Sequence, residues 1–174
     1  MTRIMFVDDE ENVLRSLQRS LRRQPWDIIT YTDPHEALHH LQREEFAVVV
    51  SDYRMPGING VQFLEYCRFR QKNAVRVILS AHTEKNGMLE AVNTAQIYRF
   101  LTKPWDEGEL IGVLKNAIET YQLKEEKDEL LMLVEDQRRE LTEQRRTLQA
   151  FAREHPELVN VTRDLEDRIV LDGI

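Results

Sequence analysis

Five polar residues that share one kind of position are the first sign of chemistry in this sequence. Each follows a short apolar run: Asp8 and Asp9 follow RIMFV, Asp52 follows FAVVVS, Ser80 follows VRVIL, and Lys103 comes shortly after IYRFL. If these runs are parallel strands, their carboxyl ends meet at one edge of a sheet, where ligands bind in open α/β folds. Three carboxylates would repel one another there unless a cation joined them. An all-oxygen ligand set favours Mg²⁺, or a similar hard ion such as Mn²⁺.

A lysine and a hydroxyl opposite such a metal suit a phosphoryl group. The ammonium of Lys103 would offset the phosphoryl charge, and the hydroxyl of Ser80 could donate to a phosphoryl oxygen. The carboxylate of Asp52 could act as a nucleophile and form an acyl phosphate. A single Asp at a strand end is more often a turn or cap residue. The prediction therefore depends on all five positions together.

The apolar runs alternate with amphipathic segments over the first 122 residues. Strands are expected at residues 3–7, 27–31, 46–51, 75–80 and 97–101, and helices at 12–23, 34–43, 60–71, 84–94 and from about 106. The third helix is expected to turn inward Val61, Leu64 and either Cys67 or Arg68. Alternation of this kind predicts a parallel sheet with helices on both faces. Right-handed crossovers make a doubly wound three-layer sandwich the simplest topology.

Four segments, in this order, resemble the receiver domains of bacterial two-component response regulators over about residues 2–122. They are VDDE at 7–10, SDYRMPGING at 51–60, ILSAHT at 78–83 and FLTKPW at 100–105. The resemblance implies a flavodoxin-like α/β fold with five parallel strands in the order 2-1-3-4-5. It also implies that the protein accepts a phosphoryl group from the phosphohistidine of a sensor histidine kinase or phosphotransfer protein.

The resemblance also gives the candidate residues their roles. Asp52 is expected to be the phosphoacceptor, with Lys103 and Ser80 on the phosphoryl oxygens. The expected Mg²⁺ ligands are Asp8, Asp9, Asp52 and the backbone carbonyl of Arg54. Such a domain catalyses its own phosphorylation and dephosphorylation without being a conventional enzyme.

Three further positions are expected to tune the response. Arg54 and His82 lie two residues beyond Asp52 and Ser80, where the resemblance implies an influence on the lifetime of the phosphate. Phe100 occupies the aromatic switch position. Phosphorylation would bias Phe100 and the face of residues 84–101, as a population shift of a two-state element.

A long helix is expected to leave the receiver. Residues 106–154 contain no proline, and their only glycines, Gly108 and Gly112, lie near the start. A 4-3 pattern runs from 123 to 151, and its apolar members predict a coiled coil: Leu123, Leu130, Val134, Leu141, Leu148 and Phe151. A parallel homodimer is expected, because a lone helix would leave this apolar seam exposed. In such a dimer Glu140 would face the partner's Arg145, which informs the register. A long solvated monomeric helix is the alternative.

Three parts are therefore predicted: a receiver at 1–122, a dimerisation and signalling coiled coil at 123–155, and a short acidic tail at 156–174 with room for one helix. The FLTKPW segment and the coil are similar to regulators with cyclic-dinucleotide phosphodiesterase-type outputs. In that case an effector domain would belong to a longer protein. Otherwise the chain would recruit a partner. The alternative to a phosphorelay is a phosphorylation-independent coiled-coil adaptor or scaffold with a receiver fold.

Composition excludes several other classes. The 174 residues include 24 Lys and Arg against 31 Asp and Glu, a net charge of −7, without the basic stripe that nucleic acid requires. One cysteine allows neither a disulfide framework nor a cysteine-based zinc site. No apolar run approaches the roughly 18 residues of a membrane span, and no signal peptide is evident. A cytoplasmic location without membrane insertion is expected.

Overall fold

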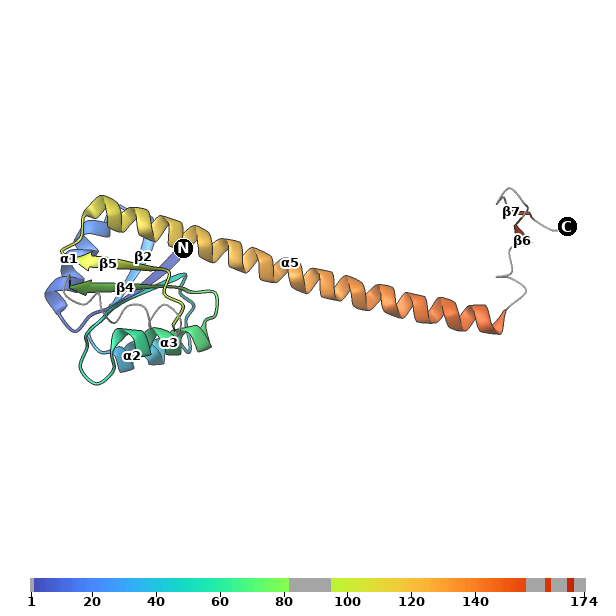
Figure 1. Cartoon of the computed structure of the whole chain (residues 1–174), viewed down its shortest axis with the longest axis horizontal. Helices are drawn as coiled ribbons and strands as arrows, with labels where there is room; N and C mark the ends of the chain where they lie inside the picture. The colour runs from blue at the N-terminus through green and yellow to red at the C-terminus, as the bar shows by residue number, and fades with distance from the viewer. Residues whose placement is uncertain (1, 82–94, 156–161, 164–168, 171–174) are drawn as a thin grey trace. The chain divides into compact units, whose positions relative to one another are not determined.

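A five-stranded parallel sheet forms the centre of the receiver. The computed structural model describes residues 2–81 and 95–155 and two short strands at 162–163 and 169–170. The strands of the sheet are β1 (Thr2–Val7), β2 (Trp26–Tyr31), β3 (Val48–Asp52), β4 (Val75–Ala81) and β5 (Arg99–Lys103). They pair in parallel in the order β2-β1-β3-β4-β5 (Figure 1). The predicted fold and strand order are confirmed.

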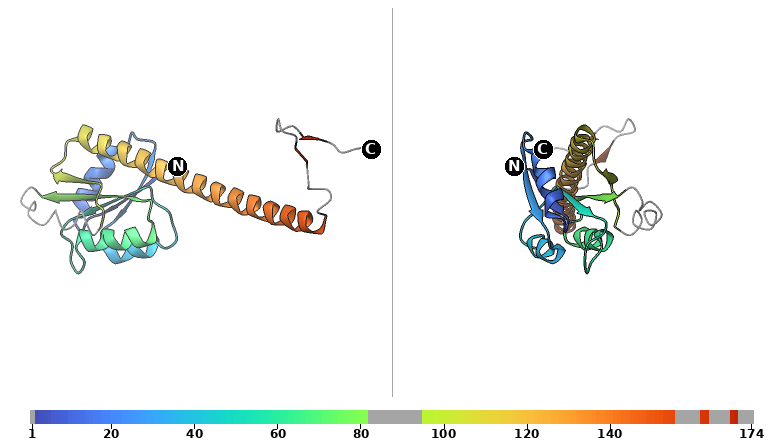
Figure 2. Two further views of the ribbon diagram at one scale, coloured as in Figure 1. Left: turned by 45° about the vertical axis from the view of Figure 1, so that its right-hand side comes forward. Right: turned by 90° about the vertical axis from the view of Figure 1, so that its left-hand side faces the viewer.

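Helices cover both faces of this sheet, as expected for parallel strands. They are α1 (Glu11–Leu21), α2 (Pro34–His40), α3 (Gly60–Arg70) and α5 (Glu107–Glu154). Figure 2 shows α1 and the first turns of α5 on one face and α2 and α3 on the other. The helix expected at 84–94 lies outside the described residues.

Strand β3 shows why the sheet needs both layers. Val48, Val49 and Val50 are all buried. Because successive side chains of a strand point to opposite faces, Val48 and Val50 join the core with α1 and α5, whereas Val49 joins the core with α2 and α3. Burying one such side chain stabilises the fold by about 1.5–3 kcal/mol, so both layers hold the end of β3, and with it Asp52, in place.

The start of α3 is fixed by a capping box. The side chain of Asn59 accepts a hydrogen bond from the N–H of Gln62 (2.9 Å), and the side chain of Gln62 accepts one from the N–H of Asn59 (3.2 Å). With this start, α3 buries Phe63, Leu64 and Cys67. Val61 is partly buried and packs against the same core, so the predicted inner side of α3 is confirmed. Of the two alternatives offered by the sequence, Cys67 is buried and Arg68 is only partly buried.

The chain forms two compact units, residues 1–126 and 127–174. Helix α5 is continuous across this boundary, and the long helix predicted after the receiver is confirmed. In the tail, β6 (Thr162–Arg163) and β7 (Ile169–Val170) pair antiparallel, where the sequence suggested a helix. Thr, Ile and Val are β-branched and favour strands. Within the described residues, no helix combines the length and apolarity that crossing a bilayer requires.

Candidate functional site

The carboxyl ends of β1, β3, β4 and β5 bring the candidate residues to one edge of the sheet. Asp8 directly follows β1, Asp52 and Lys103 end β3 and β5, and Ser80 is the penultimate residue of β4. Strand pairing sets Asp52 beside Leu79, and Ser80 beside Thr102. The prediction that these residues share one edge is confirmed by the strand order.

The side chain of Lys103 joins the two carboxylates. Its Nζ lies 2.6 Å from Oδ2 of Asp8 and also contacts Oδ1 of Asp52. Asp8 is 1% exposed and Asp52 is 8% exposed, so water screens this triad far less than a surface ion pair. One lysine thus offsets two buried carboxylates, which leaves the cluster with a net negative charge.

Burial and pairing move the pKa values of the cluster in physically distinct ways. Burial raises the pKa of Asp8, although the contact with Lys103 and the N–H of Glu10 act in the opposite direction. Burial alone would lower the pKa of Lys103, but its contacts with Asp52 and Asp8 outweigh burial, and the pKa of this ammonium is raised. Lys103 therefore stays charged at neutral pH, as a group that binds a phosphoryl anion must.

Each carboxylate also accepts a backbone hydrogen bond from the residue two positions later. Oδ1 of Asp8 accepts from the N–H of Glu10 (3.0 Å), and Oδ2 of Asp52 accepts from the N–H of Arg54 (2.7 Å). With one oxygen on the lysine and the other on a backbone donor, both carboxylates are held in one orientation. A carboxylate oriented in this way is prepared for attack on an incoming phosphorus.

A hard divalent cation fits the chemistry of this pair. The donors are carboxylate oxygens only, and Oδ2 of Asp8 is buried, with an ion pair to Lys103 but no aligned hydrogen bond. Asp9, by contrast, lies at the exposed rim. Among the described residues, no three acidic, histidine or cysteine side chains are grouped closely enough to hold a metal. The structure thus brings together two of the three carboxylates that the sequence suggested as ligands.

The remaining predicted residues are less directly placed. Ser80 is buried, and its hydroxyl donates to the carbonyl of Ala81 (3.4 Å). The side chain of Arg54 is exposed, and Phe100 is partly buried on β5 beside Ile78. His82 lies outside the described residues.

Two neighbours that the sequence did not single out for chemistry support the backbone of Asp52. The hydroxyl of Ser51 donates to the carbonyl of Asp52 (2.9 Å). Gly60 donates its N–H to the carbonyl of Tyr53 (2.9 Å), and a Cβ added to Gly60 would lie 1.9 Å from the Asp52 carbonyl oxygen. The capping pattern of Asn59 and Gln62 was the available signal for where α3 begins, but it did not indicate how close that start lies to β3.

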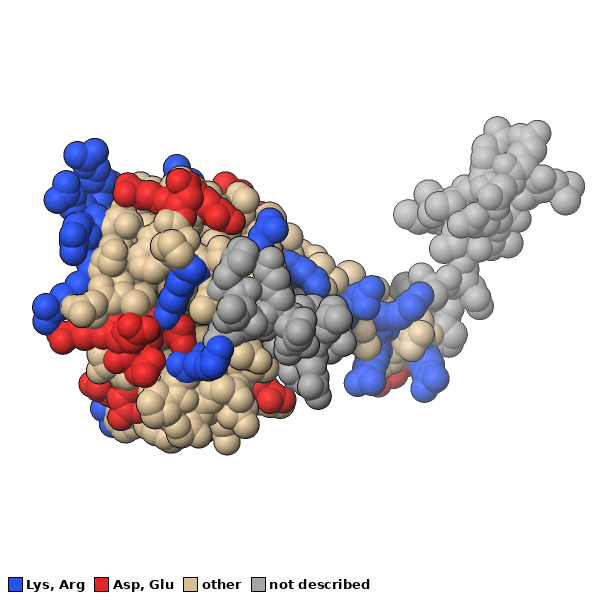
Figure 3. All heavy atoms as spheres, turned by 60° about the vertical axis from the view of Figure 1, so that its left-hand side comes forward, with Lys and Arg blue, Asp and Glu red and all other residues tan. Residues whose placement is uncertain are grey.

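The surface around this edge carries both signs of charge. Figure 3 brings forward the side of the receiver toward which β4 and β5 point, and shows Asp and Glu side chains in patches with Lys and Arg side chains between them. Asp8 and Asp52 differ from these surface charges because they are buried.

Comparison with known proteins agrees with this geometry. A family model described as the response regulator receiver domain matches residues 4–115. The hydrogenase transcriptional regulatory protein HoxA of Cupriavidus necator is 34% identical over 121 residues, which are 70% of this chain and 25% of that protein. The regulatory protein AtoC of Escherichia coli K12 is 28% identical over 126 residues, 72% of this chain and 27% of that protein. The chain thus spans about a quarter of the length of these relatives.

Solved structures show the same likeness. The signal receiver domain of an HD domain-containing protein from Pseudomonas fluorescens Pf-5 has 30% identity and a TM-score of 0.69, covering 72% of this chain and 92% of that one. A structure titled adenylate cyclase from Rhodopirellula baltica has 32% identity and a TM-score of 0.70, covering 75% of this chain and 98% of that one.

Proposed function

This chain belongs to the response regulator receiver family, and we propose that it is the phosphoryl-accepting component of a two-component phosphorelay, with Asp52 as the acceptor. The observation that carries the proposal is the buried contact of Lys103 with both Asp8 and Asp52 at the carboxyl edge of the sheet. The phosphoryl donor would be a phosphohistidine on a sensor kinase or a phosphotransfer protein.

In the proposed reaction, one carboxylate oxygen of Asp52 attacks the phosphorus of the phosphohistidine. An O–P bond forms, the P–N bond breaks, and the imidazole leaves with its electron pair. The N–H of Arg54 and the ammonium of Lys103 hold the carboxylate during the attack. Lys103 then offsets the charge of the transferred group, and the hydroxyl of Ser80 can turn from Ala81 toward a phosphoryl oxygen.

We propose that Asp8, Asp9, Asp52 and the backbone carbonyl of Arg54 hold Mg²⁺ or Mn²⁺ at this edge. Bound there, the cation would supply charge compensation for the phosphoryl oxygens. Since Nζ of Lys103 contacts both buried carboxylates, the lysine competes with the cation for the same oxygens. Release of the lysine toward the phosphoryl group would leave these oxygens to the cation.

Tuning and switching are assigned as the sequence suggested. Arg54 and His82 are proposed to set the lifetime of the acyl phosphate, because they lie two residues beyond Asp52 and Ser80, the two residues proposed to contact the phosphoryl group. Phe100 is proposed to respond to the state of Ser80. Phe100 pairs with Ile78 of β4, and Ser80 lies two residues after Ile78 on the same strand. Receiver activity of this kind is self-phosphorylation and self-dephosphorylation, rather than turnover of a released product.

We propose that α5 carries the output by forming a parallel coiled-coil homodimer. The apolar side chains of its 4-3 seam are exposed in the single chain, as Leu123 at 66% and Leu148 at 68% illustrate. A helix with an exposed apolar seam gains stability when a second helix covers that seam. Receiver phosphorylation would then alter the pairing or register of the coil, and an effector domain or partner would read the change.

Light scattering tests the coil. The full chain should have the mass of two copies, and a Leu130→Glu, Leu141→Glu double variant should be monomeric. Gln149→Glu, outside the seam, is the matched control and should remain a dimer. A wild-type chain that stays monomeric throughout the micromolar range contradicts the coil proposal.

The chemistry is tested with acetyl phosphate and Mg²⁺ as the donor mixture. We expect a phosphorylated form that hydroxylamine removes, since hydroxylamine cleaves acyl phosphates, and that Lys103→Met forms poorly. A phosphorylated form that resists hydroxylamine would place the phosphate on another kind of residue. Absence of any phosphorylated form would instead favour the phosphorylation-independent adaptor.

A further inference from the structure

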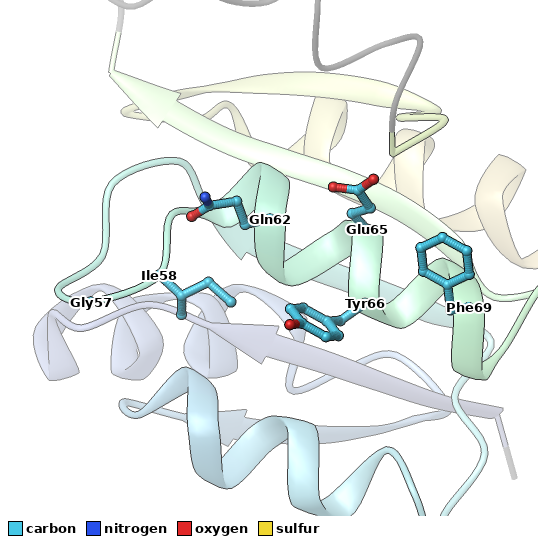
Figure 4. Close-up of a pocket in the computed structure, with 6 residues that line it drawn as sticks. All are labelled: Gly57, Ile58, Gln62, Glu65, Tyr66 and Phe69. Carbon is cyan, nitrogen blue, oxygen red and sulfur yellow. The ribbon is translucent and has the colours of Figure 1, made fainter.

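The outward side of α3 carries an aromatic surface that the phosphoryl-transfer chemistry does not use. Tyr66 is 57% exposed and Phe69 is 76% exposed. They line a groove of about 550 Å³ together with Gly57, Ile58, Gln62 and Glu65. Figure 4 shows these side chains following one another along α3 and the loop before it. Exposed aromatic pairs of this kind mark interaction surfaces more often than isolated exposed residues do.

The spacing on this surface has the form of a helix-pairing seam. Gln62, Tyr66 and Phe69 follow a 4-3 pattern, while the core side chains Phe63, Leu64 and Cys67 occupy the opposite side of α3. The side chain of Gln62 is engaged in the capping box, so Tyr66 and Phe69 form the apolar centre. The helix therefore has one face for its own core and a second face available to another helix.

The charges beside the seam make it self-complementary. Glu65 immediately precedes Tyr66, and Arg70 immediately follows Phe69, so they flank the aromatic pair on opposite sides. When two parallel helices pack on such a seam, the residue directly before a seam position of one helix faces the residue five positions later on the other helix. Glu65 of one copy would thus face Arg70 of the other, and the two-fold axis would repeat the pair.

We propose that this α3 face is a second self-association surface whose occupant is the same face of a second copy. Tyr66 and Phe69 pack on their counterparts, and the two Glu65–Arg70 pairs fix the parallel alignment. A face of two helical turns buries less than the roughly 800 Å² per partner of a stable complex. The association is therefore weak and concentration-dependent. It is independent of the α5 seam and of phosphoryl transfer. Where α5 holds two chains together as a dimer, the α3 face would join one such dimer to another.

Sedimentation velocity tests this surface with the full chain carrying Leu130→Glu and Leu141→Glu, so that the α5 seam does not contribute. From micromolar to near-millimolar concentration, the weight-average mass should rise above one copy. Phe69→Ser should weaken the association about tenfold or more. Glu65→Arg and Arg70→Glu should each weaken it a few-fold, and the double charge swap should restore it. Lys115→Glu, on α5 and the other face of the sheet, is the matched control and should change nothing.

Two results would overturn the proposal. One is a mass that stays at one copy at the highest concentration. The other is an association that Phe69→Ser leaves intact or that the double swap fails to rescue. The same α3 variants in a chain with the original α5 seam separate the two surfaces. Dimers that persist and are unaffected by Phe69→Ser support the α5 coil alone. Binding of Tyr66 and Phe69 to a different protein, without self-association, would also contradict it.

Discussion

Replacing Gly60 by alanine should separate the start of α3 from the strand that carries the phosphoacceptor. The added Cβ would lie 1.9 Å from the carbonyl oxygen of Asp52 and 2.9 Å from its carbonyl carbon. Real Cβ atoms do not approach closer than 3.0 Å, so the helix or the strand must move by at least about 1.1 Å. The obstacle is backbone, which cannot rotate away as a flexible side chain can.

The magnitude follows from two opposing effects. Forcing an extra methyl into a packed site costs about 3 kcal/mol at the upper end of the usual range, the appropriate end for a backbone obstacle. The alanine gains at most about 1 kcal/mol from the reduced entropy of the unfolded chain. The free energy of unfolding should therefore fall by about 2 kcal/mol. For a domain of this size, that lowers the urea midpoint by about 1 M.

The measurement is urea unfolding followed by tryptophan emission. Both tryptophans, Trp26 and Trp105, pack against the receiver core, so the signal reports the receiver rather than the distal part of α5. Gly112→Ala is the matched control: no atom lies within 4 Å of its added Cβ, and this variant should be more stable by about 0.5–1 kcal/mol. A Gly60→Ala midpoint equal to or above that of the wild type would refute the contact between Gly60 and Asp52.

Three further outcomes follow from the cluster and the core. Asp8→Asn should raise the free energy of unfolding at neutral pH by about 1–3 kcal/mol, because burial raises the pKa of Asp8 and Lys103 keeps Asp52 as a partner. The stability linked to protonation of Asp8 is present below its ordinary pKa of 3.8 and is lost as the pH rises through the raised pKa of the folded state. The stability advantage of the variant should therefore vanish in acid. A variant less stable than wild type in urea at neutral pH would contradict this. Lys103→Met should lower the free energy of unfolding by about 3–5 kcal/mol without Mg²⁺, since the carboxylates lose their internal cation. For the same reason the variant should bind Mg²⁺ more tightly. If Mg²⁺ stabilised the variant less than the wild type, Lys103 would not compete with Mg²⁺ for the carboxylates. Burial raises the pKa of the Cys67 thiol, so the native chain should resist iodoacetamide at neutral pH and react only after denaturation, and rapid native labelling detected by mass would count against a closed α3 core.

The site was predictable where it depends on the ends of strands. Asp8, Asp52 and Lys103 come together because the carboxyl ends of parallel strands share an edge, a rule that needs no knowledge of side-chain packing. Asp9 shows the limit of that rule, because consecutive residues after a strand point in different directions and only Asp8 turns inward. The backbone N–H groups of Glu10 and Arg54 that bind the carboxylates, and the close approach of Gly60 to Asp52, depend on how the loops and α3 pack against β3. The spacing of residues in the sequence does not show that packing.

The fold shows a similar division. The β-branched run of β3 predicted a strand covered on both faces, and Val48 and Val49 fall into separate cores. Helix α3 was predicted with Val61 and Leu64 inward, and both contact the core, but the helical spacing left open whether Cys67 or Arg68 would follow them. In the structure Cys67 is buried, and Tyr66 and Phe69 lie on the outward side.

Intact mass spectrometry of the full chain after incubation with acetyl phosphate and Mg²⁺ tests the central claim most directly. The account predicts a gain of one phosphoryl group per chain, which is absent from an Asp52→Asn variant and abolished when the metal is chelated. A phosphoryl group that persists in Asp52→Asn, or no gain in the wild type at any donor concentration, would contradict Asp52 as the acceptor.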